Sequence, residues 1–294
     1  MTATTAHEAI GEAGVSDEGG RPAGRPPLVP VVALGLLTIV TYGACFYAYG
    51  VLIAPIAAET GWSQAALGGI FSGVLLLAGI GGILAGGLLD RFGEQPLFAF
   101  AATVGAGALL LAAFQTQLAT FALFYVMGCG LVGALGFYHV TQTIAARVAP
   151  DAAARAIIWL TLIGAFSGPL YLPATGWLAE TIGWRGAIKV DAATVAVAFV
   201  GTALLIRGHG GRPSRRPRQS PLRALRRALR DVRMVRWLAA TLIAGAAVDA
   251  LMLYQVPAMV SLGLPLSLAA ALAGLRGAAQ LAGRLPLGPL IAHF

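Results

Sequence analysis

The stretch Gly86-Gly-Leu-Leu-Asp-Arg-Phe-Gly-Glu-Gln95 decides how this chain folds, because it separates two long apolar runs with only a few polar residues. Asp90 and Arg91 place two charges between segments that would otherwise be continuous hydrocarbon. The glycine pair at the start of the stretch permits two helices to pack closely, and Gly93 supplies the positive φ of a tight turn. A connection this short predicts two neighbouring helices that run antiparallel.

Composition places the whole chain in a membrane. Of its 294 residues, 58% are hydrophobic and 11% are charged, and the mean hydropathy is +0.80. A soluble domain carries about 25% charged residues, so this chain has too few of them to cover its apolar side chains in water. We therefore expect an integral protein of the cell membrane, with the lipid bilayer as its partner.

Eight apolar runs approach or exceed the length of a membrane helix, which needs about 20 mostly apolar residues. The expected spans are Val29–Ala57, Ala65–Leu89, Leu97–Phe114, Phe121–Val148, Ala156–Ala179, Ala187–Ile206, Trp237–Val260 and Leu266–Ala292. The predicted fold class is therefore all-α, a polytopic membrane helix bundle. We expect a disordered tail over residues 1–28, a six-helix bundle over 29–206, a loop over 207–236 and two helices of an incomplete second bundle over 237–294.

Basic residues set the expected orientation, because cytoplasmic loops are enriched in Lys and Arg. One set of loops carries Arg21, Arg25, Arg91, Arg147, Arg155 and the basic residues of the segment 207–236. The opposite loops offer Arg185 and Lys189. Both termini are therefore predicted to be cytoplasmic.

The segment 207–236 holds eleven arginines and one acidic residue, Asp231. Its second half, Ser220–Arg236, opens with serine at a plausible N-cap and proline at the first helical position. Leucines recur there at helical spacing with arginines between them, which predicts an amphipathic helix on an anionic inner leaflet. Despite the net charge of +8, nucleic-acid binding is not expected, because nothing in the segment reads bases or stacks on them.

The connection between the second and third spans resembles a family motif. Gly86, Leu88, Asp90, Arg91 and Gly93 are similar to the Gly-x-Leu-x-Asp-Arg-x-Gly motif of the major facilitator superfamily. The basic pair that usually follows is replaced by an acidic residue and an amide. The resemblance implies a secondary active transporter that works by alternating access around a midplane site. An ordinary polar hairpin between two membrane helices is the alternative interpretation.

An internal repeat agrees with this resemblance. Residues 61–92 align without a gap to residues 263–294, and glycine pairs with glycine at three positions, beginning with Gly61 and Gly263. A parallel repeat relates the two halves of this transporter fold. On this alignment Phe294 corresponds to Phe92, so the resemblance implies a chain truncated after its eighth helix.

Further motifs resemble the monocarboxylate and oxalate–formate carrier branches. They are Tyr49-Gly50-Val51, Gly61-Trp62-Ser63 and Gly183-Trp184-Arg185. An arginine in the eighth helix, here Arg276, is similar to the substrate arginine of those carriers. The aspartate that precedes it by four residues is replaced by Leu272, and the lysine of their first helix is missing. The resemblance implies a small organic anion such as a monocarboxylate, with protons as the coupling ion.

Two charged residues fall deep inside predicted spans. Asp249 lies about twelve residues into the seventh span and Arg276 about ten into the eighth, so at about 1.5 Å per residue both reach mid-bilayer. Charge there costs about 2.5–3.5 kcal/mol, which indicates a functional role. Arg276 either binds an anionic substrate with its planar fork of donors, pairs permanently with Asp249, or extends along a water-filled cavity. Gln280 lies one turn away on the same face, which suits a cavity lining.

Other polar residues are weaker candidates. His139 in the fourth span is either a proton carrier or a hydrogen-bonded packing residue, and Asp249 is the second proton candidate. Tyr138 and Gln142 lie near His139 and are predicted to bind substrate. A polar stripe on the first span either faces a central cavity or bonds to neighbouring helices; it consists of Thr38, Thr41, Tyr42, Cys45 and Tyr49. We include Tyr42 and Tyr49 in the predicted substrate site.

The fifth span contains Gly164-Ala-Phe-Ser-Gly168-Pro169, which partly resembles the Gly-x-x-x-Gly-Pro motif of proton-coupled exporters. It keeps proton-coupled efflux of lipophilic drugs as an alternative, although a kink with small-residue packing explains it equally well. A truncated membrane scaffold without transport activity is a further alternative. Cys45 and Cys129 lie in apolar runs and are predicted to be buried thiols. The sequence contains no pattern typical of an enzyme, a cofactor site or a metal site.

Overall fold

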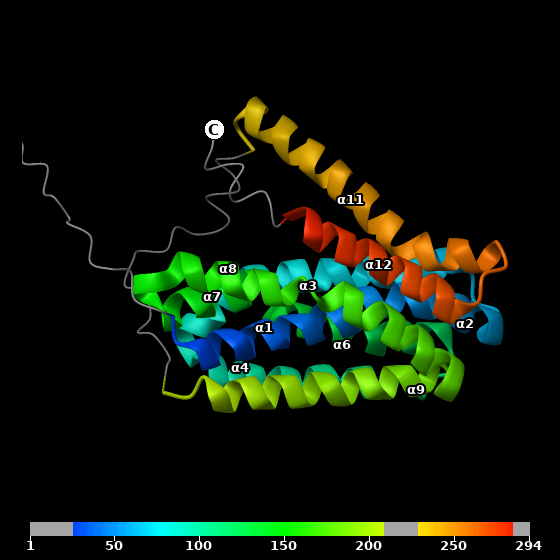
Figure 1. The fold of residues 1–294 in the computed structure, drawn as a ribbon, viewed down its shortest axis with the longest axis horizontal. Coiled ribbons are helices and arrows are strands. Elements are labelled where there is room, and N and C mark those ends of the chain that lie inside the picture. The colour runs from blue at the N-terminus through cyan, green and yellow to red at the C-terminus, as the bar shows by residue number, and fades with distance from the viewer. Residues whose placement is uncertain (1–25, 209–228, 285–294) are drawn as a thin grey trace, which may run out of the picture.

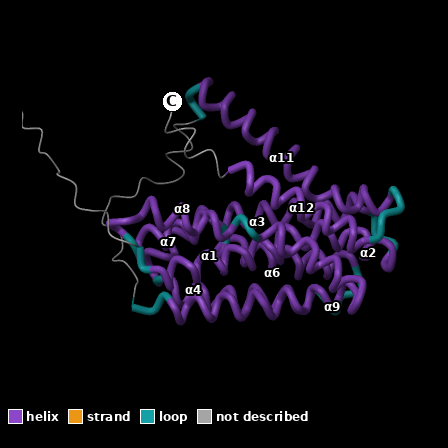
Figure 2. The backbone as a smooth tube through the Cα atoms, viewed as in Figure 1, coloured by secondary structure: helices purple, strands orange, loops and turns teal. Residues whose placement is uncertain are grey.

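The computed structural model describes residues 26–208 and 229–284, except for the side chains of residues 280, 281, 283 and 284. Most helices lie side by side with their long axes aligned, while α11 diverges from the rest (Figure 1). All regular elements within the described residues are helices, and short loops connect most of them (Figure 2). The predicted all-α membrane bundle is confirmed.

The first four spans begin and end close to the predicted residues. The first consists of α1 (Leu28–Tyr42), the π-helical η1 (Gly43–Tyr47) and α2 (Ala48–Thr60), and the second of α3 (Gln64–Phe92). The third consists of α4 (Glu94–Phe100), the π-helical η2 (Ala101–Gly105) and α5 (Ala106–Ala112), and the fourth of α6 (Leu118–Gly136) and α7 (Tyr138–Val148). All but the second are therefore interrupted.

The remaining spans follow the short 3-10 turn η3 (Pro150–Ala152). They are formed by α8 (Ala153–Gly164), α9 (Ser167–Leu205), α11 (Val232–Ser261) and α12 (Leu266–Arg284). The chain reverses direction within α9 at Gly183, whose φ of 75° and ψ of 166° are not helical (Figure 1). Thus α9 holds the end of the fifth predicted span and all of the sixth.

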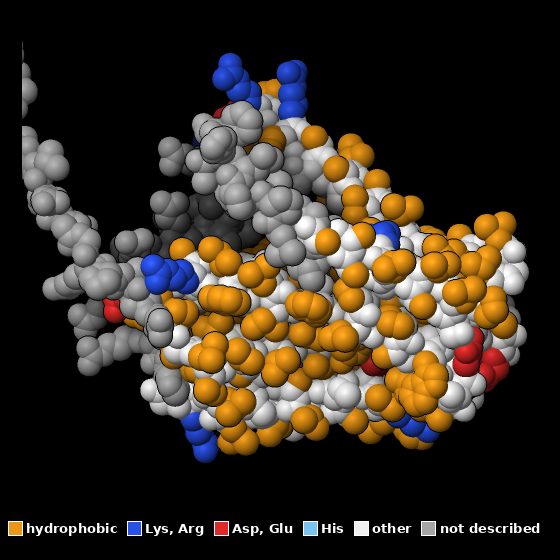
Figure 3. Space-filling view, in the orientation of Figure 1, with side chains coloured by type: hydrophobic (Ala, Val, Ile, Leu, Met, Phe, Trp, Pro, Cys, Tyr) orange, Lys and Arg blue, Asp and Glu red, His pale blue; other side chains and the backbone are white. Residues whose placement is uncertain are grey.

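Six helical stretches among the described residues are long and apolar enough to cross a membrane. One of them, Pro150–Leu205, contains the reversal at Gly183, and Leu266–Ala279 is a shorter apolar helix. Large apolar side chains cover the flank of the bundle, and most charged side chains visible on this face lie near its ends (Figure 3). This distribution is that of a multi-pass membrane protein, whose apolar flank meets lipid.

Glycines with positive φ make the turns at both ends of the bundle. Gly93 has the predicted positive φ, at 79°, and lets α4 follow α3 directly. Gly61 and Gly263, which the internal repeat aligns, have φ of 72° and 91°. Because residues with a Cβ rarely adopt this conformation, the shared backbone geometry supports the alignment of the two halves.

The start of α11 corrects one prediction. Leu229 and Arg230 form a turn, and Asp231 is extended and caps α11 by accepting a 2.9 Å hydrogen bond from the backbone N–H of Arg233. The predicted amphipathic helix Ser220–Arg236 therefore does not continue unbroken to Arg236, because a side-chain cap starts a new helix. Its first part, over residues 220–228, lies outside the described residues, as do most of the predicted tail and residues 285–294.

Candidate functional site

Besides the third span with its π-helix η2, three spans of the amino-terminal bundle are interrupted within their length. In the fourth span, Phe137 is extended, with φ −77° and ψ 168°, between α6 and α7. In the fifth, Ala165 and Phe166 separate α8 from α9, and in the first the π-helix η1 widens the turn over Gly43–Tyr47. Interrupted membrane helices and π-bulges expose backbone groups and are frequent at binding sites.

Aromatic side chains bring these interruptions together. The Tyr42 ring stacks on Phe137 with centroids 4.2 Å apart and lies 5.0 Å from the Tyr138 ring. Tyr138 lies directly against Gly164, where a Cβ atom would overlap its hydroxyl. The three breaks are therefore neighbours in space, and we call Tyr42, Phe137 and Tyr138 the aromatic cluster.

The predicted residues Tyr138 and Gln142 of α7 both form hydrogen bonds to Thr161 of α8. The Tyr138 hydroxyl donates to the carbonyl oxygen of Thr161 at 3.5 Å, and Gln142 Nε2 donates to Thr161 Oγ1 at 3.2 Å. Sequence reasoning did not select Thr161, although a threonine in an apolar run is a common hydrogen-bonding group between membrane helices.

Asp249 lies in a groove of about 930 Å³ between α3 and α11. Phe71, Ser72 and Leu75 line its α3 side, while Thr241 and Tyr254 join Asp249 on the α11 side. The carboxylate is half-buried and lies close enough to Tyr42 to interact with it electrostatically. Asp249 therefore faces the amino-terminal bundle across the groove.

Arg276 contacts α11 on a different face from Asp249. Its Nε donates to Gln255 Oε1 at 3.0 Å, and one terminal nitrogen lies 2.6 Å from the sulfur of Met252. At 3.6 residues per turn, Gln255 is about 120° around α11 from Asp249. No ion pair joins Arg276 to a carboxylate among the described residues, so the predicted pair with Asp249 is not formed in this structure.

Gln255 is a site residue that sequence reasoning missed. Its Nε2 is buried and has no hydrogen-bond partner within the described part of the chain. Leaving such a group unpaired costs about 1–3 kcal/mol. The amide therefore presents two N–H donors beside the guanidinium of Arg276. The indication that the sequence offered for this residue was a single amide side chain within the apolar run of the seventh span.

Several predicted site residues lie elsewhere. Tyr49 is completely buried and donates to the carbonyl oxygen of Leu67 at 3.0 Å, so it packs in the core and does not line a cavity. His139 Nε2 lies 3.2 Å from the carbonyl oxygen of Ala134, and its ring lies over Gly82 of α3. It therefore does not join Tyr138 and Gln142 in their hydrogen bonds to Thr161. The side chain of Gln280 lies outside the described residues.

The rest of the polar stripe on the first span mostly bonds helices together. Thr38 Oγ1 donates to Thr141 Oγ1 at 3.0 Å, and Thr41 Oγ1 donates to the carbonyl oxygen of Gly136 at 2.9 Å. Both threonines are fully buried. Cys45 and Cys129 are buried free thiols, as predicted. Tyr42 is the member of the stripe that belongs to the aromatic cluster.

The motif between the second and third spans forms an ion pair at one end of the bundle. Arg147 at the end of α7 donates to Asp90 at 2.6 Å and lies 4.0 Å from Glu94. The guanidinium of Arg91 lies over the Phe92 ring, 5.1 Å from its centroid. The motif thus ties the α3–α4 turn to the fourth span.

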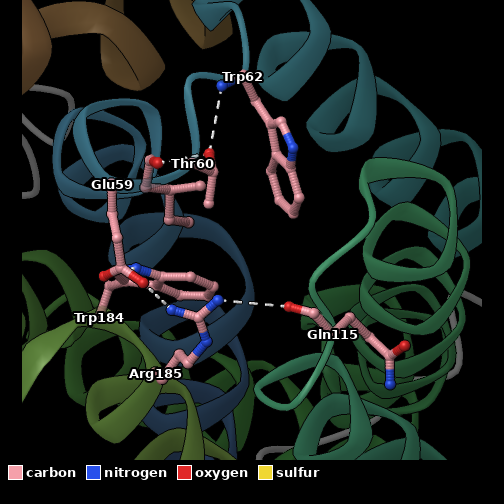
Figure 4. Close-up of polar contacts among 7 residues, drawn as sticks. Glu59, Thr60, Trp62, Gln115, Trp184 and Arg185 are labelled. Carbon is pink, nitrogen blue, oxygen red and sulfur yellow. Dashed lines mark hydrogen bonds and ion pairs between the residues drawn. The ribbon is translucent and has the colours of Figure 1, made fainter.

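At the opposite end, the loops of the amino-terminal bundle are joined through Glu59 (Figure 4). Trp184 Nε1 donates to its carboxylate at 2.8 Å, and Arg185 forms an ion pair with the same group. Arg185 also reaches the carbonyl oxygen of Gln115 at 3.5 Å. These contacts connect α2, the α5–α6 loop and the turn of α9.

The two halves touch at this same end and separate toward the other. Glu180 Oε1 accepts a hydrogen bond from the backbone N–H of Ser267 at 2.8 Å, and the Tyr254 hydroxyl donates to the carbonyl oxygen of Gln64 at 3.3 Å. By contrast, 6% of the most apolar window of α11 is buried. Toward Val232, where α11 begins, α11 diverges from the amino-terminal bundle (Figure 1).

Metal binding has no support among the described residues, which contain no group of three or more His, Cys, Asp or Glu placed to hold an ion.

Comparisons with known proteins agree with this architecture. The family model described as the Major Facilitator Superfamily matches residues 34–294. Among solved structures, the crystal structure of a D-xylose-proton symporter is similar to this chain with a TM-score of 0.62 at 15% sequence identity. The alignment covers 90% of this chain and 69% of the symporter chain. No curated protein sequence matches.

Proposed function

Since this chain belongs to the Major Facilitator Superfamily, we propose that it is a secondary active transporter of a small organic anion, such as a monocarboxylate, and that Arg276 binds the anion. Transport is proposed to be coupled to protons. The similar solved structure is a symporter that uses protons, which supports this form of coupling by analogy of fold.

The availability of Arg276 carries the proposal. The guanidinium is half-buried near the middle of α12, and its hydrogen bonds within the described residues go to one amide oxygen and one thioether sulfur. A charge at this depth is costly without a partner. Arginine holds five N–H donors in a planar fork that matches a carboxylate. An anionic solute therefore supplies the partner that the described residues do not.

The neighbouring amide strengthens the site. Gln255 accepts from Arg276 through Oε1 and keeps its buried Nε2 unpaired. A carboxylate bound to the guanidinium accepts from this Nε2 as well. Such a solute satisfies two donors that are otherwise unmatched, and a neutral hydrocarbon satisfies neither.

Alternating access follows from the contacts between the two halves. By the positive-inside rule both termini are proposed to be cytoplasmic, so the end at which α11 diverges toward Val232 faces the cytoplasm. The contacts of Glu180 with Ser267 and of Tyr254 with Gln64 then close the outer end. We therefore propose that this conformation is inward-open and that outward opening breaks these two contacts. The aromatic cluster lines the path on the side of the amino-terminal bundle, and Asp249 lines it on the side of α11.

The experiment measures uptake of radiolabelled lactate into vesicles that contain the purified chain, with an imposed inward proton gradient. We expect saturable uptake by the wild type. Arg276→Gln is expected to abolish it, and Arg276→Lys to retain a small part, because lysine keeps the charge and loses the fork. Arg233→Gln, which removes an arginine at the exposed start of α11, is the matched control and is expected to leave uptake unchanged.

Equal uptake by the wild type and Arg276→Gln, with equal amounts of protein in the vesicles, contradicts the assignment of Arg276. A panel that includes pyruvate, oxalate and the lipophilic cation tetraphenylphosphonium tests the class of solute. Proton-driven extrusion of the cation without transport of any anion would favour efflux instead.

A further inference from the structure

Asp191 is a buried carboxyl group to which the proposed solute site gives no role. It lies in the second half of α9, eight residues beyond the reversal at Gly183, and is 4% exposed. At about 1.5 Å per residue this places it about 12 Å inside the bundle from that turn. Its backbone carbonyl accepts from Thr194 Oγ1 at 3.0 Å. The carboxyl group itself therefore needs a separate explanation.

The described groups that interact electrostatically with Asp191 are polar, and none of them is a cation. Cys45 of η1, Tyr125 of α6 and Tyr171 in the first half of α9 lie close enough to Asp191 to interact electrostatically. The α5 segment packed on α9 contains only Gly, Ala and Leu. These neighbours are neutral when protonated, so they do not compensate a carboxylate.

The cationic side chains closest to Asp191 in sequence, or on helices packed against α9, contact other groups. Lys189 places its Nζ 4.5 Å from the centroid of the Phe114 ring. Arg185 pairs with Glu59 of α2 at the outer end, and Arg276 of α12 contacts Gln255. Among the ion pairs of the described residues, none includes Asp191.

A buried carboxylate without a cation is costly, whereas the protonated acid is neutral and donates a hydrogen bond. We propose that Asp191 is a proton-binding site built into the amino-terminal bundle, separate from the solute site at Arg276. Binding of a proton neutralises the group while it is buried against η1, and exposure during the transport cycle releases it. The role in coupling rests on the proposed transport function; the protonation itself does not.

Tyr171 is the route by which the proton exchanges with water. It is half-buried, whereas Cys45 and Tyr125 are buried, and its hydroxyl lies 3.5 Å from Thr194 Oγ1. Its ring packs directly on Gly43, where a Cβ atom would overlap it. A movement of the π-helical turn η1 therefore displaces the Tyr171 ring and changes the access of water to Asp191.

Infrared spectroscopy of the full chain in lipid at neutral pH tests the proposal without any solute. A protonated aspartic acid gives a carbonyl stretching band. The band is assigned by the shift in its frequency when the protein is produced with aspartate carrying ¹³C at the side-chain carboxyl. We expect one such band in the wild type, its loss in Asp191→Asn and its displacement in Asp191→Glu. Asp249→Asn is the matched control and is expected to retain it. Tyr171→Phe is expected to slow its shift in heavy water.

Absence of a protonated aspartic acid band from the wild type at neutral pH overturns the proposal, as does its persistence in Asp191→Asn. If Asp191→Asn does not reach the membrane, the labelled wild type and Asp249→Asn decide: loss of the band in Asp249→Asn assigns the proton to the groove instead. Lactate uptake is scored separately, so a negative transport result leaves the spectroscopic result intact.

Discussion

Arg147 donates a 2.6 Å hydrogen bond to Asp90, although the two residues are 57 positions apart and belong to different spans. The Arg147 side chain is 16% exposed and that of Asp90 is 33% exposed. The pair is therefore intermediate between a surface ion pair, which contributes little, and a buried one, whose disruption is expensive. It fixes the end of α7 in the fourth span to the motif between the second and third spans.

Asp90→Asn and Arg147→Gln are each expected to destabilise the protein by about 1–3 kcal/mol, because each removes the 2.6 Å ion pair from a half-buried position. The double variant is expected to cost less than the sum of the two. Thermal unfolding in detergent, followed by the loss of helical circular dichroism, measures all three. Strict additivity would show that the pair contributes no coupling energy.

Gln255→Leu is expected to weaken anion binding by about 5–30-fold, which corresponds to one lost hydrogen bond to a charged group of about 1–2 kcal/mol. The maximal rate should change less than the KM, because Arg276 remains. Concentration-dependent lactate uptake, supported by the rise in unfolding temperature that lactate causes, measures the effect. Ser261→Ala, a polar deletion at the last residue of the same helix, is the control. A KM equal to that of the wild type would remove Gln255 from the site.

Gly176→Ala is expected to disturb the contact between α9 and α12. A Cβ atom there would lie 2.7 Å from the Cβ of Ala270 and 3.3 Å from the Cα of Ser267. Overpacking of this kind costs about 1–3 kcal/mol. Gly201→Ala, in the same helix but facing open space, is the matched control and is expected to be neutral or slightly stabilising, because alanine favours helix. Equal unfolding temperatures of the two variants would contradict the close approach.

Trp184→Phe is expected to lower the unfolding temperature more than Arg185→Gln. The indole is 2% exposed and donates to Glu59 at 2.8 Å, so its loss removes a hydrogen bond to a charged group and leaves a cavity. The ion pair of Arg185 with Glu59 is largely exposed, and such pairs contribute about 1 kcal/mol or less. The same thermal measurement orders the variants; the reverse order would show that the ion pair dominates.

Glu180→Gln tests the contact that joins the two halves at the outer end. The amide keeps an oxygen acceptor for the backbone N–H of Ser267 but loses the charge that favours the start of α12. We expect an increase in outward-open molecules, measured as faster labelling by a thiol reagent of a cysteine introduced at Ser267. The same cysteine in a protein that keeps Glu180 is the reference. Identical labelling rates would mean that this contact does not hold the outer end closed.

Sequence by itself determined where the chain crosses the membrane, because burial in lipid requires long apolar helices and turns need particular residues. The runs around Gly93 and Gly183 were assigned correctly, since a positive φ is favourable only without a Cβ. It offered a kink in the Gly164-to-Pro169 motif of the fifth span as one of two interpretations, and it did not indicate that the fourth span breaks at Phe137, because breaks within apolar runs depend on packing against neighbouring helices.

Only the tertiary structure decided which polar groups meet. Asp249 and Arg276 were placed at the same depth by counting residues, but the rotation of α11 turns Asp249 toward α3 and leaves Arg276 against Gln255. Asp191 sits inside a predicted span, yet its lack of an ion pair with the described cations became visible only once η1 and α6 were packed around it. Depth in a membrane follows from position along the chain; partnership follows from helix rotation and neighbours, which one-dimensional spacing does not fix.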